Sequence, residues 1–166
     1  MKTFKNIVCC ICFISTTMLL AQKTNATDKS YYKDWVGEWY KEVNDTLEKL
    51  PSFIVTQGLY KESFEEVWIG AGGSFSKAWR AWDGRTQQWG FAWISVDGLF
   101  QTWEGKKVNE IWYMYKTFVL DNGKKVLSRQ AFIPSGKGVL IRTSEHSTDQ
   151  GKTWTLRFKE KYVKRR

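Results

Sequence analysis

Cysteine is nearly missing from this chain of 166 residues and is confined to one short segment. The three cysteines are Cys9, Cys10 and Cys12. The rest of the sequence therefore excludes disulfides, thiolate metal sites and a cysteine nucleophile. Histidine is also scarce, since His146 is the only one. One histidine without nearby cysteine argues against a catalytic zinc site, and we expect no metal and no other cofactor.

Long apolar runs are missing as well, except near the start of the chain. The run from Ile7 to Leu20 follows a basic segment containing Lys2 and Lys5, and the small residue Ala21 comes directly after it. This arrangement is typical of a secretory signal peptide, and the run is short for a membrane span. We predict cleavage near Ala21, a secreted or periplasmic protein, and no transmembrane span in the mature chain. The alternative is a buried N-terminal strand.

Acidic residues are outnumbered by basic ones. The formal net charge is +9, and it is +7 when Lys2 and Lys5 are removed with the predicted signal peptide. Such an excess is usual for a solvated basic surface, and it also suits attraction to acidic glycans or anionic surfaces. The sequence has no basic stripe interleaved with aromatics in an RNA-binding motif, so we expect no nucleic-acid partner.

Aromatic residues are abundant. The chain has ten tryptophans, all after the predicted cleavage point, together with seven tyrosines and ten phenylalanines. Each large ring contributes much apolar area, so this composition predicts a thick core, a lined cavity, or both.

Turn signals such as Asp83-Gly84, Asp97-Gly98 and Glu104-Gly105 divide the chain into short runs rich in aromatic and β-branched residues. In the last run Trp154, Leu156, Phe158 and Tyr162 share one face, while Thr155, Arg157, Lys159 and Lys161 share the other. We predict an all-β fold, an antiparallel up-and-down meander that closes into a barrel, because closure removes exposed strand edges. The predicted strands are 53–61, 64–69, 74–82, 88–96, 99–103, 108–120, 125–134, 139–147 and 153–163.

The segment 30–49 fits two interpretations. Its apolar residues have helical spacing, but Gly37 lies in the middle, which is unfavourable in a helix. We favour a first strand over 35–43 and a short helical turn near 44–50; a helix over 30–49 packed on an open sheet is the alternative. The predicted organisation is a signal peptide over 1–21, a flexible lead over 22–33, a barrel domain over 34–163 and a basic tail over 164–166.

The stretch STDQGKTW, 147–154, has the spacing of the Asp-box motif of glycan-processing β-propellers. The motif occurs once, and a set of four-stranded propeller blades does not fit in this length. We therefore interpret it as a structural turn. Asp149 is expected to accept hydrogen bonds from backbone N–H groups across the loop, and Gly151 to supply a left-handed backbone position.

Three segments together resemble a family of small bacterial lipocalin-like (calycin-like) β-barrel proteins, mostly of unknown function. They are Gly37-Glu38-Trp39, the stretch 66–73 (EVWIGAGG), and the block from Arg129 to Pro134 with 144–154 after it. The resemblance covers roughly 34–163. It implies that Trp39 plugs the closed end of a barrel, with Gly37 beside it, and that a cation, Arg157 or Lys164, stacks over that ring.

A barrel of this size has room for one small ligand. The first hypothesis is that a small, largely apolar molecule binds among aromatic rings, with Arg129 paired to Glu160 as the polar anchor. Glu160 lies on the apolar face of its strand and must have a partner. Which face of 139–147 points inward is left open, because a slip of one residue exchanges the two. The rings expected to line the cavity are Trp79, Trp93, Trp112 and Trp154.

Two other functions compete with cavity binding. One is a secreted glycan-binding module that uses exposed tryptophans and the basic surface. The other is a proton-transfer enzyme, an isomerase, cyclase or dehydratase, with His146 or Glu160 as the base. Catalytic motifs are weak: the chain lacks Gly-x-Ser-x-Gly, and the stretch 70–74 (GAGGS) lacks the Gly-Lys-Ser/Thr ending of a phosphate loop.

Overall fold

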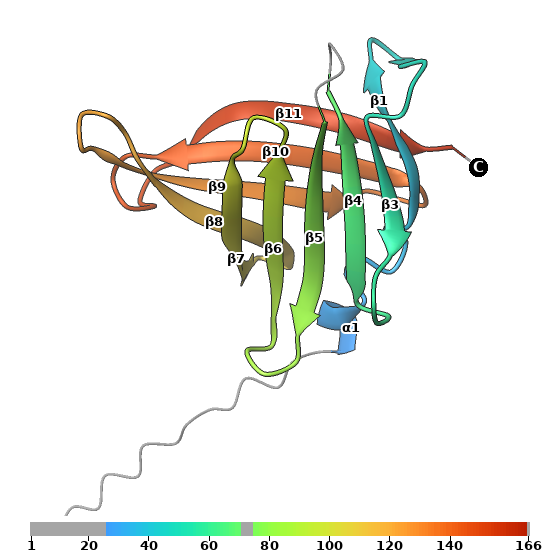
Figure 1. The fold of residues 1–166 in the computed structure, drawn as a ribbon, viewed down its shortest axis with the longest axis horizontal. Coiled ribbons are helices and arrows are strands. Elements are labelled where there is room, and N and C mark those ends of the chain that lie inside the picture. Colours follow the sequence, from blue (N-terminus) through green and yellow to red (C-terminus); the bar gives the residue numbers. More distant parts are fainter. Residues whose placement is uncertain (1–25, 71–74, 166) are drawn as a thin grey trace, which may run out of the picture.

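The chain forms a closed antiparallel β-barrel of ten strands (Figure 1). The computed structural model describes residues 26–70 and 75–165. The predicted signal peptide therefore lies outside the described residues, as does most of the glycine stretch 70–74. The barrel strands are β1 (Gly37–Val43), β3 (Phe53–Gln57), β4 (Ser63–Ile69), β5 (Phe75–Asp83), β6 (Gln88–Ser95), β7 (Phe100–Val108), β8 (Ile111–Val119), β9 (Lys125–Pro134), β10 (Val139–Ser147) and β11 (Thr155–Lys164).

The topology is the predicted up-and-down meander. Each barrel strand pairs with the one before it, and β11 returns to pair with β1, where Trp39 lies opposite Lys164. The short strand β2 (Thr46–Leu47) folds back on β1 outside this closed order. Closure leaves no long unpaired edge among the ten strands. No helix of the described residues is long and apolar enough to cross a membrane.

The helical turn predicted near 44–50 is wrong. Asn44 and Asp45 both have positive φ, at 49° and 58°, and they join β1 to β2 as a tight hairpin. Two consecutive positive φ angles are the property of the hairpin turn whose twist matches that of its strands, and Asn and Asp tolerate them. The helical spacing of apolar residues in 30–49 has another origin, since the residues before Gly37 fold over the end of the barrel.

The turn predicted at Glu104-Gly105 is also wrong. Strand β7 continues through both residues to Val108, and the reversal occurs at Asn109 and Glu110, which have φ of 48° and 65°. Gly105 has a different purpose. A Cβ at this position would overlap the backbone of Trp89 on the adjacent strand β6. The glycine therefore permits a close approach of two strands rather than a change of direction.

The end of the predicted flexible lead is part of the fold. Within 22–33, the described residues form a single helical turn, α1 (Ala26–Lys29), and then a tight turn that inserts Tyr32 into the barrel. The side-chain carboxylate of Asp28 lies 2.7 Å from Nζ of Lys107. The backbone carbonyl of Asp28 accepts a hydrogen bond from Nε1 of Trp89. The polar composition of this segment does not predict these contacts, because they are made to strands that are far away in the sequence. At the other end, Lys164 of the predicted basic tail is the last residue of β11.

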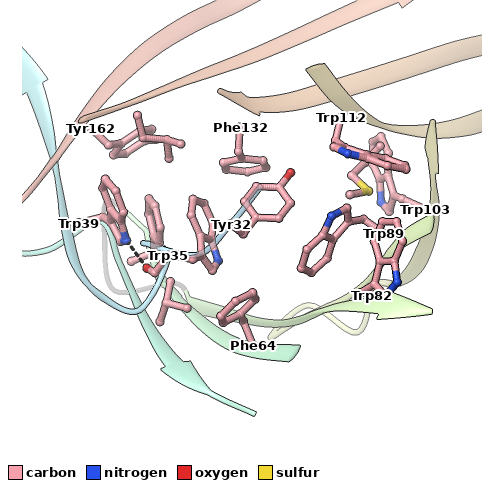
Figure 2. Close-up of a cluster of buried hydrophobic side chains, with 14 residues drawn as sticks. Tyr32, Trp35, Trp39, Phe64, Trp82, Trp89, Trp103, Trp112, Phe132 and Tyr162 are labelled. Atoms are coloured by element: carbon pink, nitrogen blue, oxygen red, sulfur yellow. Dashed lines mark hydrogen bonds between the residues drawn. The ribbon is translucent and has the colours of Figure 1, made fainter. Parts of the chain in front are cut away.

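Aromatic side chains pack together inside the barrel (Figure 2). They fill the end next to α1, where Trp89 bonds to the backbone carbonyl of Asp28. Trp39 is 3% exposed and donates a hydrogen bond from Nε1 to the carbonyl of Trp35. Nζ of Lys164 lies 5.3 Å from the Trp39 ring and donates to the carbonyls of Asp34 and Val36. The barrel is therefore closed at this end by a tryptophan beneath a cation, which is consistent with a lipocalin-like fold. The buried rings labelled in Figure 2 are Tyr32, Trp35, Trp39, Phe64, Trp82, Trp89, Trp103, Trp112, Phe132 and Tyr162.

Candidate ligand-binding cavity

The other half of the barrel is hollow. An inner cavity of about 290 Å³ continues into a wider outer chamber of about 510 Å³, and the two share Trp68, Ser76, Trp93 and Arg142 in their walls. Most of the inner wall is aromatic, which suits an apolar molecule. The remaining residues around the inner cavity are Phe91, Gln101, Trp103, Phe118, Gln130, Phe132 and Arg157.

The structure shows which side chains of strand β10 point into the barrel, a choice that the sequence left open. Arg142 and Ser144 lie on the inner side, opposite the inward-facing Phe132 and Gln130 of β9, so alternation places His146 there as well. His146 is only partly exposed, and its Nδ1 is buried without a hydrogen-bond partner among the described residues. It lies at the mouth end of its strand and has no carboxylate partner among the described residues that would orient it as a base.

Glu160 lies inside the barrel, but its partners are not the predicted one. Its carboxylate accepts hydrogen bonds at 2.8 Å from both Nζ of Lys41 and the hydroxyl of Tyr162, and a longer one at 3.3 Å from Arg142. Burial alone would raise the pKa of Glu160, but the bonds from Lys41 and Tyr162 and the charge of Arg142 bring it below its ordinary value. The carboxylate is therefore held in its charged form.

Arg129 is on the outside of the barrel, so the predicted Arg129–Glu160 anchor does not exist. Its Nε lies 2.7 Å from Glu145, and its guanidinium stacks at 4.0 Å over the ring of Trp154 and at 4.5 Å over Tyr113. The prediction failed because β9 alternates: Gln130 and Phe132 face the interior, so Arg129 next to them in the strand faces out.

The four tryptophans proposed as cavity lining are in four different places. Trp93 lines both the inner cavity and the outer chamber. Trp112 is buried at the closed end, where its ring lies 5.6 Å from that of Trp82. Trp79 faces outward on β5 and is 45% exposed, and Trp154 packs on the outer surface against Arg129.

A β-bulge in the last strand produces a cavity residue that alternation would place outside. Ser144 pairs with Phe158 and Glu145 pairs with Leu156, so Arg157 is an extra residue with no partner across the ladder. Bulges bend a strand and re-aim a side chain. Arg157 consequently lines the inner cavity, while Leu156, expected on the apolar face, is 56% exposed.

Beneath the cavity lies a completely buried ion pair. Glu66 of β4 and Arg80 of β5 are both 0% exposed and meet at 2.8 Å. The Glu66 carboxylate also accepts hydrogen bonds from Nε1 of Trp35 and of Trp68, and the guanidinium of Arg80 is surrounded by four rings at 4.6–5.1 Å. Burial disfavours the charged form of Arg80, but the adjacent carboxylate of Glu66 raises the pKa of Arg80 above its ordinary value. The pair fixes the Trp68 ring, which forms part of the cavity wall.

The stretch 147–154 makes the hydrogen bonds of a structural turn. The Asp149 carboxylate accepts bonds from the hydroxyls of Ser147 and Thr153 and from the backbone N–H of Thr153. Gly151 has φ of 90°, the expected left-handed position, and its N–H donates to Ser147. These hydrogen bonds join residues of the turn to one another, which agrees with a structural purpose.

We expect Asp149→Asn to destabilise the protein at neutral pH and to do so less as the pH falls. The hydrogen bonds from Ser147 and Thr153 hold the pKa of Asp149 well below its ordinary value of 3.8. A carboxylate with a lowered pKa in the folded state stabilises the protein above about pH 4 and loses that contribution as the pH drops through the folded pKa. Urea midpoints of the two proteins should therefore differ at pH 7 and converge below pH 3.8.

Asp121→Asn, in an exposed turn, serves as the control and should not show this convergence. A difference for Asp149→Asn that is constant over the whole pH range would contradict the assignment of its effect to the carboxylate charge.

Metal-binding groups are sparse in this cavity. Across residues 26–70 and 75–165 there is no cluster of three or more His, Cys, Asp or Glu side chains placed to hold a metal ion.

In comparisons with known proteins, no family model matches the chain, and no curated protein is significantly similar to it.

Proposed function

We propose that this protein belongs to the small bacterial lipocalin-like proteins, is exported after cleavage near Ala21, and binds a small, largely apolar molecule inside its barrel. The observation that carries the binding proposal is the cavity itself. One end of the barrel is filled with rings, yet the other keeps a space of about 290 Å³ whose wall is mostly aromatic. A chain with ten tryptophans has enough ring volume to fill its interior, so an open aromatic chamber suits occupation by a ligand.

Together with the outer chamber, the cavity has room for a molecule with two or three rings, or a chain of similar volume. Five polar side chains lie among six aromatic ones in the inner wall, which fits an apolar ligand that is oriented by a polar group. The barrel frame around the cavity is supported from below by the buried pair Glu66–Arg80, so the site is formed before the ligand arrives.

Filling the cavity should abolish binding. Ser76 points into both chambers from β5, and Ser76→Phe would place a ring in the space proposed for the ligand. We expect this variant to lose at least tenfold in affinity for N-phenyl-1-naphthylamine, a neutral apolar dye whose fluorescence rises when it leaves water. Fluorescence titration of the purified protein gives the dissociation constant.

The matched control is Lys77→Phe, which adds the same ring one residue along the strand, on the outer face. It should bind the dye as the unaltered protein does. Equal loss in both variants, or dye binding that survives in Ser76→Phe, would show that the dye does not occupy the cavity.

A further inference from the structure

We infer that the ligand is an organic acid, an apolar body carrying one oxyanion group such as a carboxylate, and that Arg142 and Arg157 bind the oxyanion. This inference rests on the proposed binding function and specifies the chemical class of the ligand. It follows from the charges that face the inner cavity, from the hydrogen bonds that Arg142 lacks, and from the bulge that turns Arg157 inward.

The inner cavity is lined by two cations and by no carboxylate among the described residues. Glu160 is the carboxylate that accepts a bond from Arg142, but it already bonds to Lys41 and Tyr162 at 2.8 Å each. Its bond to Arg142 is the longest of the three. Of the two inner cations, Arg142 shares its carboxylate with Lys41, and Arg157 bonds to none among the described residues. The other carboxylates near the site, Glu48 and Asp97, lie in the wall of the outer chamber, so the inner cavity keeps an excess of positive charge. A neutral ligand would leave this excess in place, whereas a monoanion would reduce it.

Arg142 is held in position but its donors are incompletely used. Its guanidinium lies 4.8 Å from the rings of both Trp68 and Phe158, which limit its movement. One terminal nitrogen donates to Gln130 at 3.0 Å and the other makes the long bond to Glu160, while Nε is buried without a partner among the described residues. An oxyanion accepts bonds from a guanidinium in a planar, bidentate manner, which neither Gln130 nor Glu160 does here.

Arg157 reaches the same cavity from β11 only because of the bulge opposite Ser144 and Glu145. Its side chain is exposed and has no hydrogen bond or ion pair within the described part of the chain. The bulge interrupts the regular pairing of β10 with β11, and it places the unpaired cation of Arg157 in the wall of an aromatic cavity. The two arginines therefore mark one end of the ligand, and the rings of Phe91, Trp93 and Phe118 mark the place of its apolar body.

Two matched dyes test the inference. The anion 8-anilinonaphthalene-1-sulfonate and the neutral N-phenyl-1-naphthylamine share one ring system and differ by the sulfonate. We expect the purified protein to bind the anion at least tenfold more tightly. Arg157→Gln and Arg142→Gln should each weaken binding of the anion five- to tenfold or more and change binding of the neutral dye less than twofold. Lys159→Gln, which removes one charge from the adjacent exposed part of β11, should change neither.

The outcomes separate the inference from the function beneath it. If the neutral dye binds in the cavity but the anion binds no better, or if both arginine variants behave like Lys159→Gln, the proposal of an acidic ligand is wrong and the proposed binding function is kept. If neither dye binds, both the acidic ligand and the binding function are contradicted. Arg157 has no partner to lose on substitution among the described residues, so its variant decides the case even if Arg142→Gln fails to fold. Retained affinity for the neutral dye shows that Arg142→Gln is folded.

Discussion

Replacing Glu66 by alanine is expected to lower the free energy of unfolding by about 3–5 kcal/mol, since removing one partner of a buried pair leaves the other charge uncompensated. Arg80 is completely buried and has one other side-chain hydrogen-bond partner among the described residues, the hydroxyl of Tyr32 at 3.3 Å. The change also leaves the indole N–H groups of Trp35 and Trp68 without an acceptor. Urea unfolding followed by circular dichroism measures the loss.

Two further variants identify the cause of this loss. In Glu66→Leu with Arg80→Met no charge remains buried at this place, so the double variant should be less destabilised than the sum of its single changes. Glu42→Ala removes the partner of Lys161 from a pair in which Lys161 is 44% exposed, and it should cost at most about 1 kcal/mol. If Glu66→Ala cost no more than Glu42→Ala, the buried pair would not be the support of the barrel that we describe.

The same substitution should disturb the cavity, because Glu66 reaches it through Trp68. One face of the Trp68 ring belongs to the cavity wall and packs near Arg142, and its Nε1 is fixed by the Glu66 carboxylate. Charged groups are thus arranged in two levels. The lower pair, Glu66–Arg80, is neutral and closed to solvent, whereas the upper group around Arg142 carries the positive charge that we assign to ligand recognition.

The fold was predictable because its information is local. Period-two alternation and turns rich in Gly, Asn and Asp repeat along the chain, and these predicted a closed up-and-down barrel, which the structure confirms. The lipocalin-like resemblance also predicted a cation over Trp39, and Lys164 is that cation. The prediction of elements failed at 44–50, where Asn44 and Asp45 form a hairpin turn instead of a helical one. It failed again at Glu104-Gly105, where the glycine permits a close approach of two strands instead of a turn.

The candidate site was less predictable because inward and outward positions depend on register. A period-two pattern says that Arg129 and Gln130 face opposite sides, but not which side is inner. Arg142 was one of two open alternatives, and its partner Glu160 is 18 residues away on the next strand. Arg157 could not be found by alternation at all, since the bulge that turns it inward interrupts the alternation.

Gly105 offers the sharpest test of the difference between a turn glycine and a packing glycine. We expect Gly105→Ala to cost about 2–3 kcal/mol, because overpacking a tight site forces the backbone to shift. The added Cβ would overlap the carbonyl oxygen of Trp89 and lie within 3.3 Å of its carbonyl carbon and nitrogen. Trp89 is 0% exposed and packs against Tyr32 and Trp82, so it has little room to move. Urea unfolding measures the change.

Gly84 is the matched control, since it lies in the turn between β5 and β6, has no positive φ, and has no neighbouring atom within 4 Å of the place where a methyl group would be added. Gly84→Ala should stay within about 0.5 kcal/mol of the unaltered protein. If both substitutions were equally mild, strands β6 and β7 would not approach as closely as the barrel requires at Trp89. If Gly105→Ala alone is costly, that glycine is needed for the contact of two strands, and the closed end of the barrel depends on it.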